Sequence, residues 1–461
     1  MRTTGFRSMV LYLLLAAFLG GLGYFLFNFA VNGDQWAMQP YNGHVYSENS
    51  TVKLGDITDR DGNLLATTED GVRIYSGDET VRRALLHTVG DPYGYISTSV
   101  QYTMRAKLSG YNIVTGLNDT IFNRMGSDIA LTIDQDACVA AYNALGGKNG
   151  GVIVYNYETG EVLVKVSAPT FDPNAVPEDI ETNDAYKGAY LDNTLSGSFT
   201  PGSIFKIVTA AAAMEKYPDT WSSLTYDCQG SVELAGSDIT CLNGHAHGTQ
   251  DMAAALGNSC NVYFAQLAND LGAEALQKKA EEMGFNTQLD FGTIPIQEST
   301  IELSGTNQNQ LGWAGVGQYT VLTNPTHMMV LMGAIAKGGT YTEPVLMEGS
   351  TDLLGQLSTS SRQLLSSTEA QNLKALLRNN VEYYYGDWLF PEGWNVCAKT
   401  GTGEVGEGKG PNCWMVGFCD SPSNPYAFAV VVEDGSGGIE SAGFKCCGFP
   451  FSKPRRFSVW K

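Results

Sequence analysis

The expected fold and chemistry of this 461-residue chain follow from residues 200–215, which read Thr-Pro-Gly-Ser-Ile-Phe-Lys-Ile-Val-Thr-Ala-Ala-Ala-Ala-Met-Glu. A Pro-Gly pair punctuates the chain, and the run Ile204–Met214 is almost entirely apolar. This pattern predicts a buried helix that begins near Ser203. Lys206 lies one turn further on, so the Ser203 hydroxyl and the Lys206 amine should share one face of that helix.

The Ser203–Lys206 pair has a chemical use. A serine hydroxyl is a weak nucleophile at neutral pH, and a lysine acts as its base only where burial lowers the amine pKa from about 10.4 toward 7. The apolar run supplies that burial, and the N–H groups at a helix start can stabilise an oxyanion. Taken alone, however, the match is better explained by a capping serine followed by a surface lysine, since about one Ser-x-x-Lys arises by chance in such a chain.

The composition indicates a globular protein with a strongly acidic body. The length allows roughly two or three domains and a large core. The net charge is −20 and the pI is near 4.6. Such a body repels phosphate polymers, so we expect no nucleic-acid partner and no partner held by a basic patch.

The N-terminal segment is expected to be a membrane anchor. Met9–Val31 is apolar apart from small residues and three polar ones, and it is long enough to cross a hydrocarbon core of about 30 Å as a helix. Arg2 and Arg7 precede it and Asp34 follows it, which predicts a cytoplasmic N-terminus and an extracytoplasmic body. A cleaved signal peptide is the alternative, but the apolar region is longer than usual for one and no clear small-x-small site follows. We expect an uncleaved, single-pass anchor in residues 1–33 of a cell-membrane protein.

Residues 34–128 are expected to form a linker and a small, mainly β domain, the pedestal. The linker is polar and runs to about Val52. Gly55–Ala66 predicts two short strands around an Asp-Gly turn, and Gln101–Leu108 predicts a helix.

Residues 129–461 are expected to form an α/β (α+β) domain, in which an antiparallel sheet is flanked by helices. Its periodicity alternates between strand-like and helix-like runs. The expected strands are Ile129–Ile133, Gly151–Asn156, Glu161–Ser167, Trp394–Gly401, Cys413–Cys419 and Tyr426–Glu433, and the expected helices are Gln135–Leu145, Gln250–Leu271, Asn324–Lys337 and Thr368–Asn380.

Two further motifs follow Ser203 in order. They are Ser259-Cys-Asn261, expected on a helix, and Lys399-Thr-Gly-Thr402, expected on a strand. Each match is weak by itself, but the ordered trio is the pattern of penicillin-binding proteins and class A β-lactamases, with Cys260 where the usual example has Asp.

The chain resembles the class B penicillin-binding proteins, which are monofunctional peptidoglycan transpeptidases. The resemblance spans roughly residues 52–440 and implies the penicillin-binding transpeptidase, or serine β-lactamase-like, fold. Gly55–Ala66 is similar to the family's N-terminal signature, with Leu54 where an arginine is usual. Further landmarks occur in the right order: Val166-Ser167, Phe171-Asp-Pro-Asn174, Gly317-Gln318, Thr323-Asn-Pro325, Ala336-Lys-Gly-Gly339 and Trp414-Met-Val-Gly-Phe418.

The resemblance implies a role for each residue of the first two motifs. Ser203 would be the acylated nucleophile and Lys206 its general base. Ser259 would relay a proton to the leaving amine, and Asn261 would hold the substrate backbone.

The resemblance also implies a substrate-binding strand. Lys399, with Thr400, Gly401 and Thr402, would bind the carboxylate of a D-Ala-D-Ala stem peptide. The N–H groups of Ser203 and Thr402 would form the oxyanion hole. A second cation at Lys399 would also lower the pKa of Lys206.

These parts predict D,D-transpeptidation without a cofactor. Ser203 attacks the penultimate D-Ala carbonyl, the terminal D-Ala leaves, and an amine of a neighbouring stem resolves the acyl-enzyme. A β-lactam would acylate the same serine, and the adduct should be long-lived because no distinct glutamate motif for deacylation is present. The alternatives are a D,D-carboxypeptidase and a membrane-bound β-lactam sensor. The resemblance implies a glycosyltransferase of the shape, elongation, division and sporulation (SEDS) family as partner, and leaves open which of these processes is served.

Nine cysteines, an odd number, leave at least one unpaired in the monomer. One group has spacing compatible with a disulfide, with free thiols or with a zinc site. We favour a disulfide, either Cys228–Cys241 or Cys241–Cys260, over free thiols, and free thiols over zinc. The group spans 33 residues and contains Cys228, Cys241, His245, His247 and Cys260.

The C-terminal tail departs from the family. Beyond Gly443 we expect a long helix that covers the sheet, but residues 444–461 have no helical period and contain two prolines. One face of the sheet is therefore expected to lack its cover, which puts the stability and activity of the domain in doubt.

Overall fold

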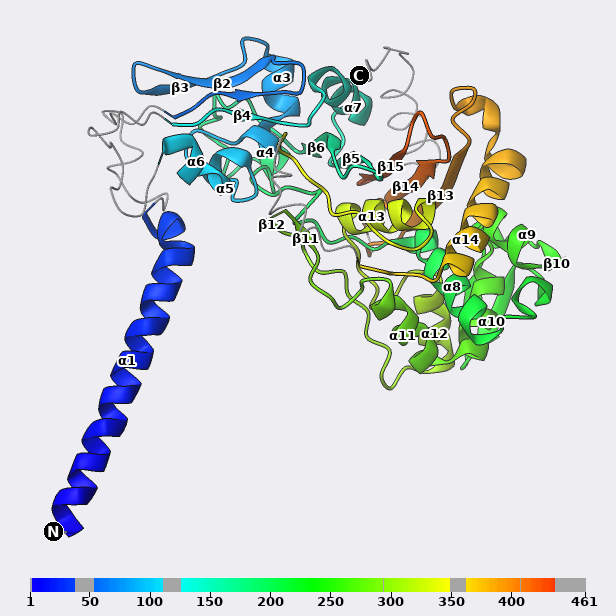
Figure 1. Cartoon of the computed structure of the whole chain (residues 1–461). Helices are drawn as coiled ribbons and strands as arrows, with labels where there is room; N and C mark the ends of the chain where they lie inside the picture. The colour runs from blue at the N-terminus through cyan, green and yellow to red at the C-terminus, as the bar shows by residue number, and fades with distance from the viewer. Residues whose placement is uncertain are drawn as a thin grey trace.

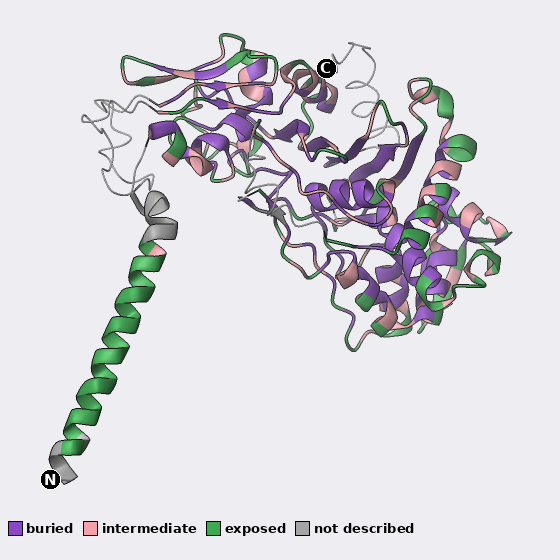
Figure 2. Cartoon of the chain, viewed as in Figure 1, coloured by how far each residue is buried: buried purple, intermediate pink, exposed green. Residues whose placement is uncertain are grey.

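The computed structural model describes residues 2–37, 54–110, 126–292, 294–348, 362–406 and 408–435. Helix α1, Arg2–Ala37, extends away from the rest of the protein (Figure 1). Its 23-residue segment Arg7–Phe29 has a mean hydropathy of 2.2, and none of its residues is buried (Figure 2). An apolar helix of this length fits a single-pass membrane anchor.

The pedestal contains a four-stranded sheet and short helices. The strands are β1 (Ile57–Thr58), β2 (Leu64–Glu69), β3 (Val72–Tyr75) and β4 (Ile129–Ala130), in the order β3-β2-β1-β4. The two strands expected around the Asp-Gly turn are thus present. β4 pairs in parallel with β1, so the strand expected to open the second domain belongs to the pedestal sheet. The helices are α3 (Glu79–Ala84), α4 (Leu86–Val89), α5 (Val100–Thr103) and α6 (Arg105–Ser109).

A five-stranded sheet forms the centre of the larger domain. All its neighbouring strands pair antiparallel, in the order β13-β14-β15-β5-β6. Nearly every residue on these strands is buried, as expected of a sheet covered on both faces. The antiparallel sheet flanked by helices that the sequence predicts is therefore confirmed. Its strands are β5 (Gly150–Asn156), β6 (Val162–Ala168), β13 (Val396–Gly403), β14 (Asn412–Cys419) and β15 (Tyr426–Val432).

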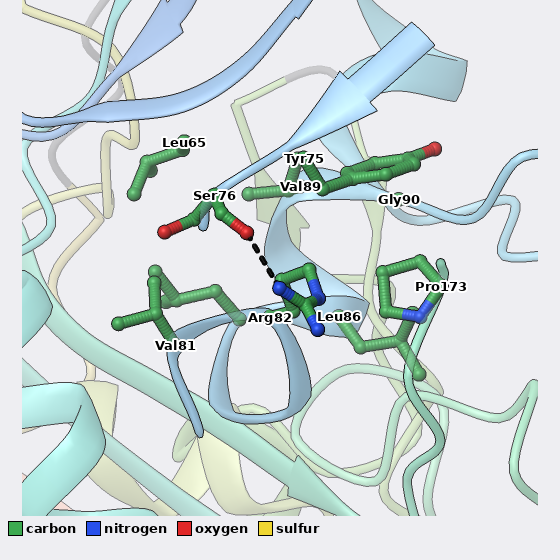
Figure 3. A pocket seen from close by; sticks show the side chains of 10 residues that line it. Leu65, Tyr75, Ser76, Val81, Arg82, Leu86, Val89, Gly90 and Pro173 are labelled. Atoms are coloured by element: carbon green, nitrogen blue, oxygen red, sulfur yellow. Dashed lines mark hydrogen bonds between the residues drawn. The ribbon is translucent and has the colours of Figure 1, made fainter. Parts of the chain in front are cut away.

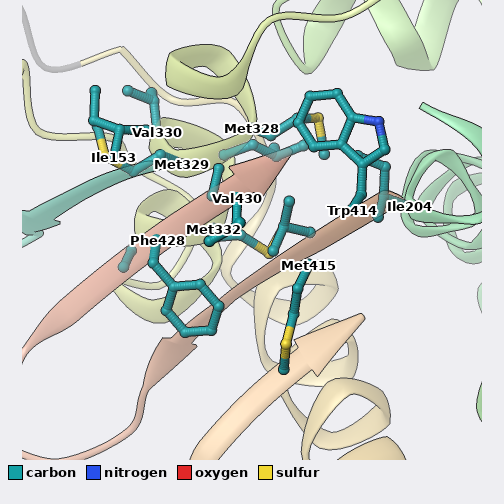
Figure 4. Close-up of a cluster of buried hydrophobic side chains, with 14 of the residues drawn as sticks. Ile153, Ile204, Met328, Met329, Val330, Met332, Trp414, Met415, Phe428 and Val430 are labelled. Carbon is teal, nitrogen blue, oxygen red and sulfur yellow. The ribbon is translucent and has the colours of Figure 1, made fainter. Parts of the chain in front are cut away.

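Helices α13, α14 and α7 pack against the sheet. The apolar helix α13 (Pro325–Ala336) lies across β5, β14 and β15, on the face of the sheet that carries Trp414, whereas Phe428 projects from the other face (Figure 4). Helix α14 (Ser367–Asn379) packs on β13, and α7 (Gln135–Leu145) packs on β6. The remaining helices are α8 (Lys206–Lys216), α9 (Met252–Gly257), α10 (Asn261–Leu271), α11 (Ala273–Glu282) and α12 (Gln308–Gly315), and the remaining strands are β7 (Tyr226–Cys228), β8 (Ser231–Leu234), β9 (Ser237–Thr240), β10 (Gly248–Gln250), β11 (Asp290–Phe291) and β12 (Ile294–Pro295).

Polar contacts join the pedestal to the larger domain. Arg82 of α3 forms a two-pronged ion pair with Asp172 and donates to the Ser76 carbonyl at 2.8 Å (Figure 3). Asp172 belongs to the Phe-Asp-Pro-Asn landmark, so that turn serves as a docking point for the pedestal. Beside it lies a cavity with room for about one water molecule, which is lined by Leu65, Tyr75, Ser76, Val81, Arg82, Leu85, Leu86, Val89, Gly90 and Pro173.

Two expectations about helices need correction. The segment expected to be one helix over Gln250–Leu271 is two, α9 and α10, because the chain turns between them and Ser259 adopts a φ of 55°. Asp251 caps α9, and the Cys260 side chain caps α10 by accepting from the Tyr263 N–H. Short polar side chains favour such caps over the helix interior. The helix expected at Gln101–Leu108 is likewise split into α5 and α6. The C-terminal tail lies outside the described residues, but the expectation that one face of the sheet would lack its cover is wrong, since nearly every residue on the strands of the sheet is buried.

Candidate active site

Ser203 lies where a tight turn meets strand β13. Gly202–Phe205 forms one 3₁₀ turn that leads directly into α8, so Ser203 precedes the α-helix proper. Gly202 has a φ of 54°, and a Cβ there would lie 2.2 Å from the Thr402 carbonyl oxygen. Only glycine allows this backbone conformation together with such a close approach. The turn therefore places the Ser203 backbone against the strand that carries Thr402.

The Lys206 amine is fully buried and bridges the first two motifs. Its Nζ lies 3.0 Å from Ser203 Oγ, 2.7 Å from the Ser259 carbonyl oxygen and 2.7 Å from Asn261 Oδ1. It also lies 3.4 Å from Ser259 Oγ. The side chain is 0% exposed. The Lys206 nitrogen thus contacts the side chains of Ser203, Ser259 and Asn261, which are the other residues expected to act in catalysis.

The surroundings of Lys206 favour its neutral form. Burial, followed by the positive charge of Lys399, lowers the pKa of Lys206 well below 10.5. A neutral amine has two N–H groups and one lone pair. The Ser259 carbonyl and Asn261 Oδ1 can only accept, so they take the two N–H groups. The lone pair is then directed at Ser203 Oγ, as a base for that hydroxyl requires.

Ser259 lies between the two lysines. Its Oγ is 3.0 Å from Lys399 Nζ and 3.4 Å from Lys206 Nζ. The turn between α9 and α10 puts Ser259 in the left-handed region, which is uncommon for a residue with a side chain. Strain of this kind is held only where the surrounding structure fixes it. The turn, rather than a continuous helix, is what lets Ser259 face both amines.

Lys399 is held at the edge of the site by strand β13. It is 0% exposed, and burial lowers its pKa to about 7. Its Nζ donates to the Thr400 carbonyl at 2.9 Å and lies 3.5 Å from Tyr385 Oη. A Cβ on Gly401 would lie 2.7 Å from the Pro201 carbonyl oxygen, so no side chain fits at that position of the strand. The structure thus brings the three motifs together around Ser203.

Comparison with known proteins assigns the family. The family model of the penicillin-binding protein transpeptidase domain matches residues 150–445. The chain is 25% identical to the peptidoglycan D,D-transpeptidase PbpA of Mycolicibacterium smegmatis over an alignment of 453 residues, which covers 89% of this chain and 90% of that protein. The chain belongs to the class B penicillin-binding proteins. The family resemblance stated from the sequence is therefore confirmed.

Solved structures agree with this assignment. The crystal structure of the D,D-transpeptidase domain of a peptidoglycan glycosyltransferase from Eggerthella lenta is 26% identical, with a TM-score of 0.72, and covers 86% of this chain and 97% of that chain. Penicillin-binding protein A from M. tuberculosis, in its ceftriaxone acyl-enzyme complex, is 24% identical with a TM-score of 0.73 and covers 86% of this chain and 96% of that chain. This penicillin-binding protein thus has the penicillin-binding transpeptidase fold.

Sequence reasoning missed Tyr385 in this penicillin-binding protein. Tyr385 ends a π-helical turn, Asn380–Tyr385, that continues α14. Its hydroxyl lies 3.3 Å from both the N–H and the Oγ1 of Thr400, and 3.5 Å from Lys399 Nζ. The sequence pattern ends a helix near Asn380 and gives no sign of the wider turn that swings Tyr385 toward β13. Tyr385 is a positioning residue for the Lys-Thr-Gly strand.

Tyr385→Phe should weaken penicillin binding more than it slows the acylation step. It removes one hydroxyl from Lys399 and Thr400 and keeps the ring, so a loss of about 1 kcal/mol, or roughly fivefold, is expected in the second-order acylation constant. Stopped-flow acylation at several penicillin concentrations separates the two steps. Tyr384→Phe is the matched control, because Tyr384 is exposed and next in the chain. Equal effects in the two variants would argue against the assigned role.

The disulfide favoured from the sequence is not formed. Cys228, Cys241 and Cys260 are all free thiols. Cys241 Sγ lies 3.7 Å from the sulfur of Cys228 and 3.7 Å from the sulfur of Cys260, well beyond a covalent S–S bond. Cys228, Cys241, His247 and Cys260 instead bring one ligand atom each into a group within 4.8 Å, and His245 is not part of it.

Proposed function

We propose that this penicillin-binding protein is a peptidoglycan D,D-transpeptidase that cross-links stem peptides through an acyl-enzyme on Ser203. The observation that carries the proposal is the buried Lys206 amine. Two oxygens that can only accept hydrogen bonds take its N–H groups, and Ser203 Oγ lies 3.0 Å away on its remaining side. Relatives with the name peptidoglycan D,D-transpeptidase support the same conclusion.

Acylation would begin with proton transfer from Ser203 to Lys206. Ser203 Oγ then bonds to the penultimate D-Ala carbonyl carbon, and the N–H groups of Ser203 and Thr402 would hold the oxyanion. Collapse of the intermediate breaks the peptide C–N bond. The proton on Lys206 would pass through Ser259 Oγ, 3.4 Å away, to the nitrogen of the departing D-Ala.

The binding strand would orient the substrate for this attack. Lys399, with Thr400, Gly401 and Thr402, would take the terminal carboxylate, and Asn261 would hold the substrate backbone. Lys399 also contacts Ser259 Oγ at 3.0 Å, so a charged Lys399 orients the relay. None of these steps needs a metal ion or other cofactor.

The second half-reaction distinguishes the candidate functions. In a transpeptidase, the amine of a neighbouring stem attacks the acyl carbon, gives its proton to Lys206 and releases Ser203. In a D,D-carboxypeptidase, the second candidate, a water molecule attacks the acyl carbon instead. A β-lactam would acylate Ser203 in either case. A β-lactam sensor would use acylation alone.

We also propose that the chain is anchored with its N-terminus in the cytoplasm and its catalytic body outside. Arg2 and Arg7 before the apolar segment support this orientation. The pedestal, within residues 34–128, would then hold the domain of residues 129–461 above the membrane. The partner would be a SEDS-family glycosyltransferase contacted through the anchor and pedestal. The family assignment supports this partner.

The test supplies the full chain in detergent with a pentapeptide stem and an acceptor amine. We expect a cross-linked dimer and released D-Ala and, in a parallel incubation with penicillin, a penicilloyl mass on the tryptic peptide that contains Ser203. Ser203→Ala should show neither, while Ser223→Ala, at an exposed serine, should match the wild type. Tetrapeptide without dimer would instead establish a carboxypeptidase. An adduct on another residue would refute the assignment of Ser203.

A further inference from the structure

We propose a structural zinc site beside the second catalytic motif, whose four ligands are Cys228, Cys241, His247 and Cys260. Each residue contributes one atom, and all four atoms lie within 4.8 Å of one another. The inference does not depend on the proposed reaction.

The spacing of the ligand atoms fits a tetrahedral ion. A zinc ion bonds thiolate sulfur at about 2.3 Å, so two sulfurs at tetrahedral corners lie about 3.8 Å apart. Cys241 Sγ lies 3.7 Å from both other sulfurs. Cys228 Sγ lies 3.4 Å from His247 Nδ1, as neighbouring S and N ligands would. Three thiolates and one imidazole with tetrahedral spacing are the donor set that zinc prefers.

The backbone around the group suits thiolate ligands. The Tyr263 N–H donates to Cys260 Sγ at 3.3 Å, and the N–H groups of Asn261 and Val262 hydrogen-bond Cys241 Sγ. All three N–H groups come from the start of α10, an 11-residue helix whose N-terminus favours negative charge. A cluster of three neutral thiols would make little use of these donors.

The chain between α8 and α9 needs a bound ion to order it. Residues 226–250 form two small hairpin ladders, β8 with β9 and β7 with β10, and most of their side chains are exposed. The buried residues of this excursion are few: Cys228, Gly230, Ile239, Cys241 and Gln250. So little apolar surface cannot order two short ladders, whereas a bound ion adds its binding free energy to folding. Figure 1 shows β10 beside α9 and α10, away from the pedestal.

The ion would also hold the catalytic turn. Cys260 stands between Ser259 and Asn261, the two residues whose oxygens receive the N–H groups of Lys206. Asn261 Nδ2 donates to the Thr240 carbonyl at 2.8 Å, next to the ligand Cys241. Zinc at this position therefore connects the hairpin excursion to the turn that orients Lys206.

The test measures metal in the full chain purified in detergent. We expect one zinc per chain by inductively coupled plasma mass spectrometry in the wild type and in Cys138→Ser, the control for a buried cysteine elsewhere. Cys241→Ser should lose most of the metal, at least about tenfold, since one missing thiolate opens the site. Because Cys241→Ser could unfold, a second measurement uses the wild type alone. Chelation followed by Co²⁺ should give the intense absorption of a tetrahedral cobalt–thiolate centre.

Two results would overturn the proposal. The first is a wild-type chain that carries no zinc and gives no tetrahedral Co²⁺ spectrum after reduction and refolding. The second is protection of two of these cysteines from alkylation that only a reductant removes, since that pattern identifies a disulfide. Zinc retained at full stoichiometry in Cys241→Ser would equally exclude this ligand set.

Discussion

Lys206→Arg should lower the rate of acylation by penicillin by a factor of about 10³, within the range of 10² to 10⁴ that a general base contributes. An arginine keeps a long cationic side chain but stays protonated, so it has no lone pair for Ser203. Lys206→Met should be as slow, since it removes the base altogether. The measurement is single-turnover acylation of the full chain with a chromogenic or fluorescent penicillin.

The pH dependence of the acylation rate separates loss of the catalytic base from a distortion of the site. Since burial and Lys399 lower the pKa of Lys206 well below 10.5, wild-type acylation should rise with pH as Lys206 loses its proton through that lowered value. Lys206→Arg should lack this rising limb. Lys216→Arg is the matched control, because Lys216 ends the same helix at the surface and should leave both rate and profile unchanged. A Lys206→Arg variant that keeps the rising limb would show that another group is the base.

The sequence predicted the parts of the site whose positions depend on local pattern. The apolar run after Ser203 required a buried helix, and its three-residue spacing to Lys206 set both groups on one face. Lys399 was correctly placed on a strand, because it belongs to the short strand-like run Trp394–Gly401. These features depend on neighbours in the chain, so periodicity reports them.

Features set by tertiary contacts could not be predicted in the same way. The residues around Ser259 suit a helix on both sides, and only the cap that the Cys260 side chain makes at the start of α10 reveals the turn. The sequence of a two-residue strand such as β4 fits the pedestal sheet and the five-stranded sheet equally well. Tertiary contacts decide with which strand it pairs. Tyr385 depends on a π-helical turn that its own sequence does not signal. The spacing of the cysteines in the sequence allowed a disulfide, free thiols or a zinc site. The distances between their sulfurs favour the zinc site.

Lys165→Met should destabilise the fold by roughly 3–5 kcal/mol, the cost of leaving a buried charge without its partner. Lys165 Nζ lies 2.5 Å from Asp192 Oδ2, and the two side chains are 1% and 0% exposed. Although burial raises the pKa of Asp192, the charges of Lys165 and His87 and hydrogen bonds from Lys165 and Thr194 hold it below 3.8. Asp192 is therefore ionised at neutral pH, and its charge becomes unpaired in the variant.

A double variant separates the loss of the Lys165–Asp192 ion pair from the loss of the long Lys165 side chain. Denaturant unfolding of the full chain at pH 7 should rank Lys165→Met below the double variant Lys165→Met/Asp192→Asn, because the second change removes the orphaned charge. Arg83→Met breaks an exposed pair with Glu79 and should cost less than about 1 kcal/mol. A Lys165→Met variant as stable as Arg83→Met would contradict the assignment.

The pair also predicts a pH dependence, whose sign follows from Asp192. Its folded pKa is lower than its unfolded value, so the stability it contributes is present above the unfolded value near 3.9 and is lost as pH falls through the lowered one. Lys165→Met should lack this acid-sensitive contribution. Since Lys165 Nζ also donates to the His87 carbonyl of α4 at 3.2 Å, the pair joins β6 to the pedestal. Its loss should therefore expose the α4–β6 contact first, as faster amide hydrogen exchange in residues 86–89 than in β14.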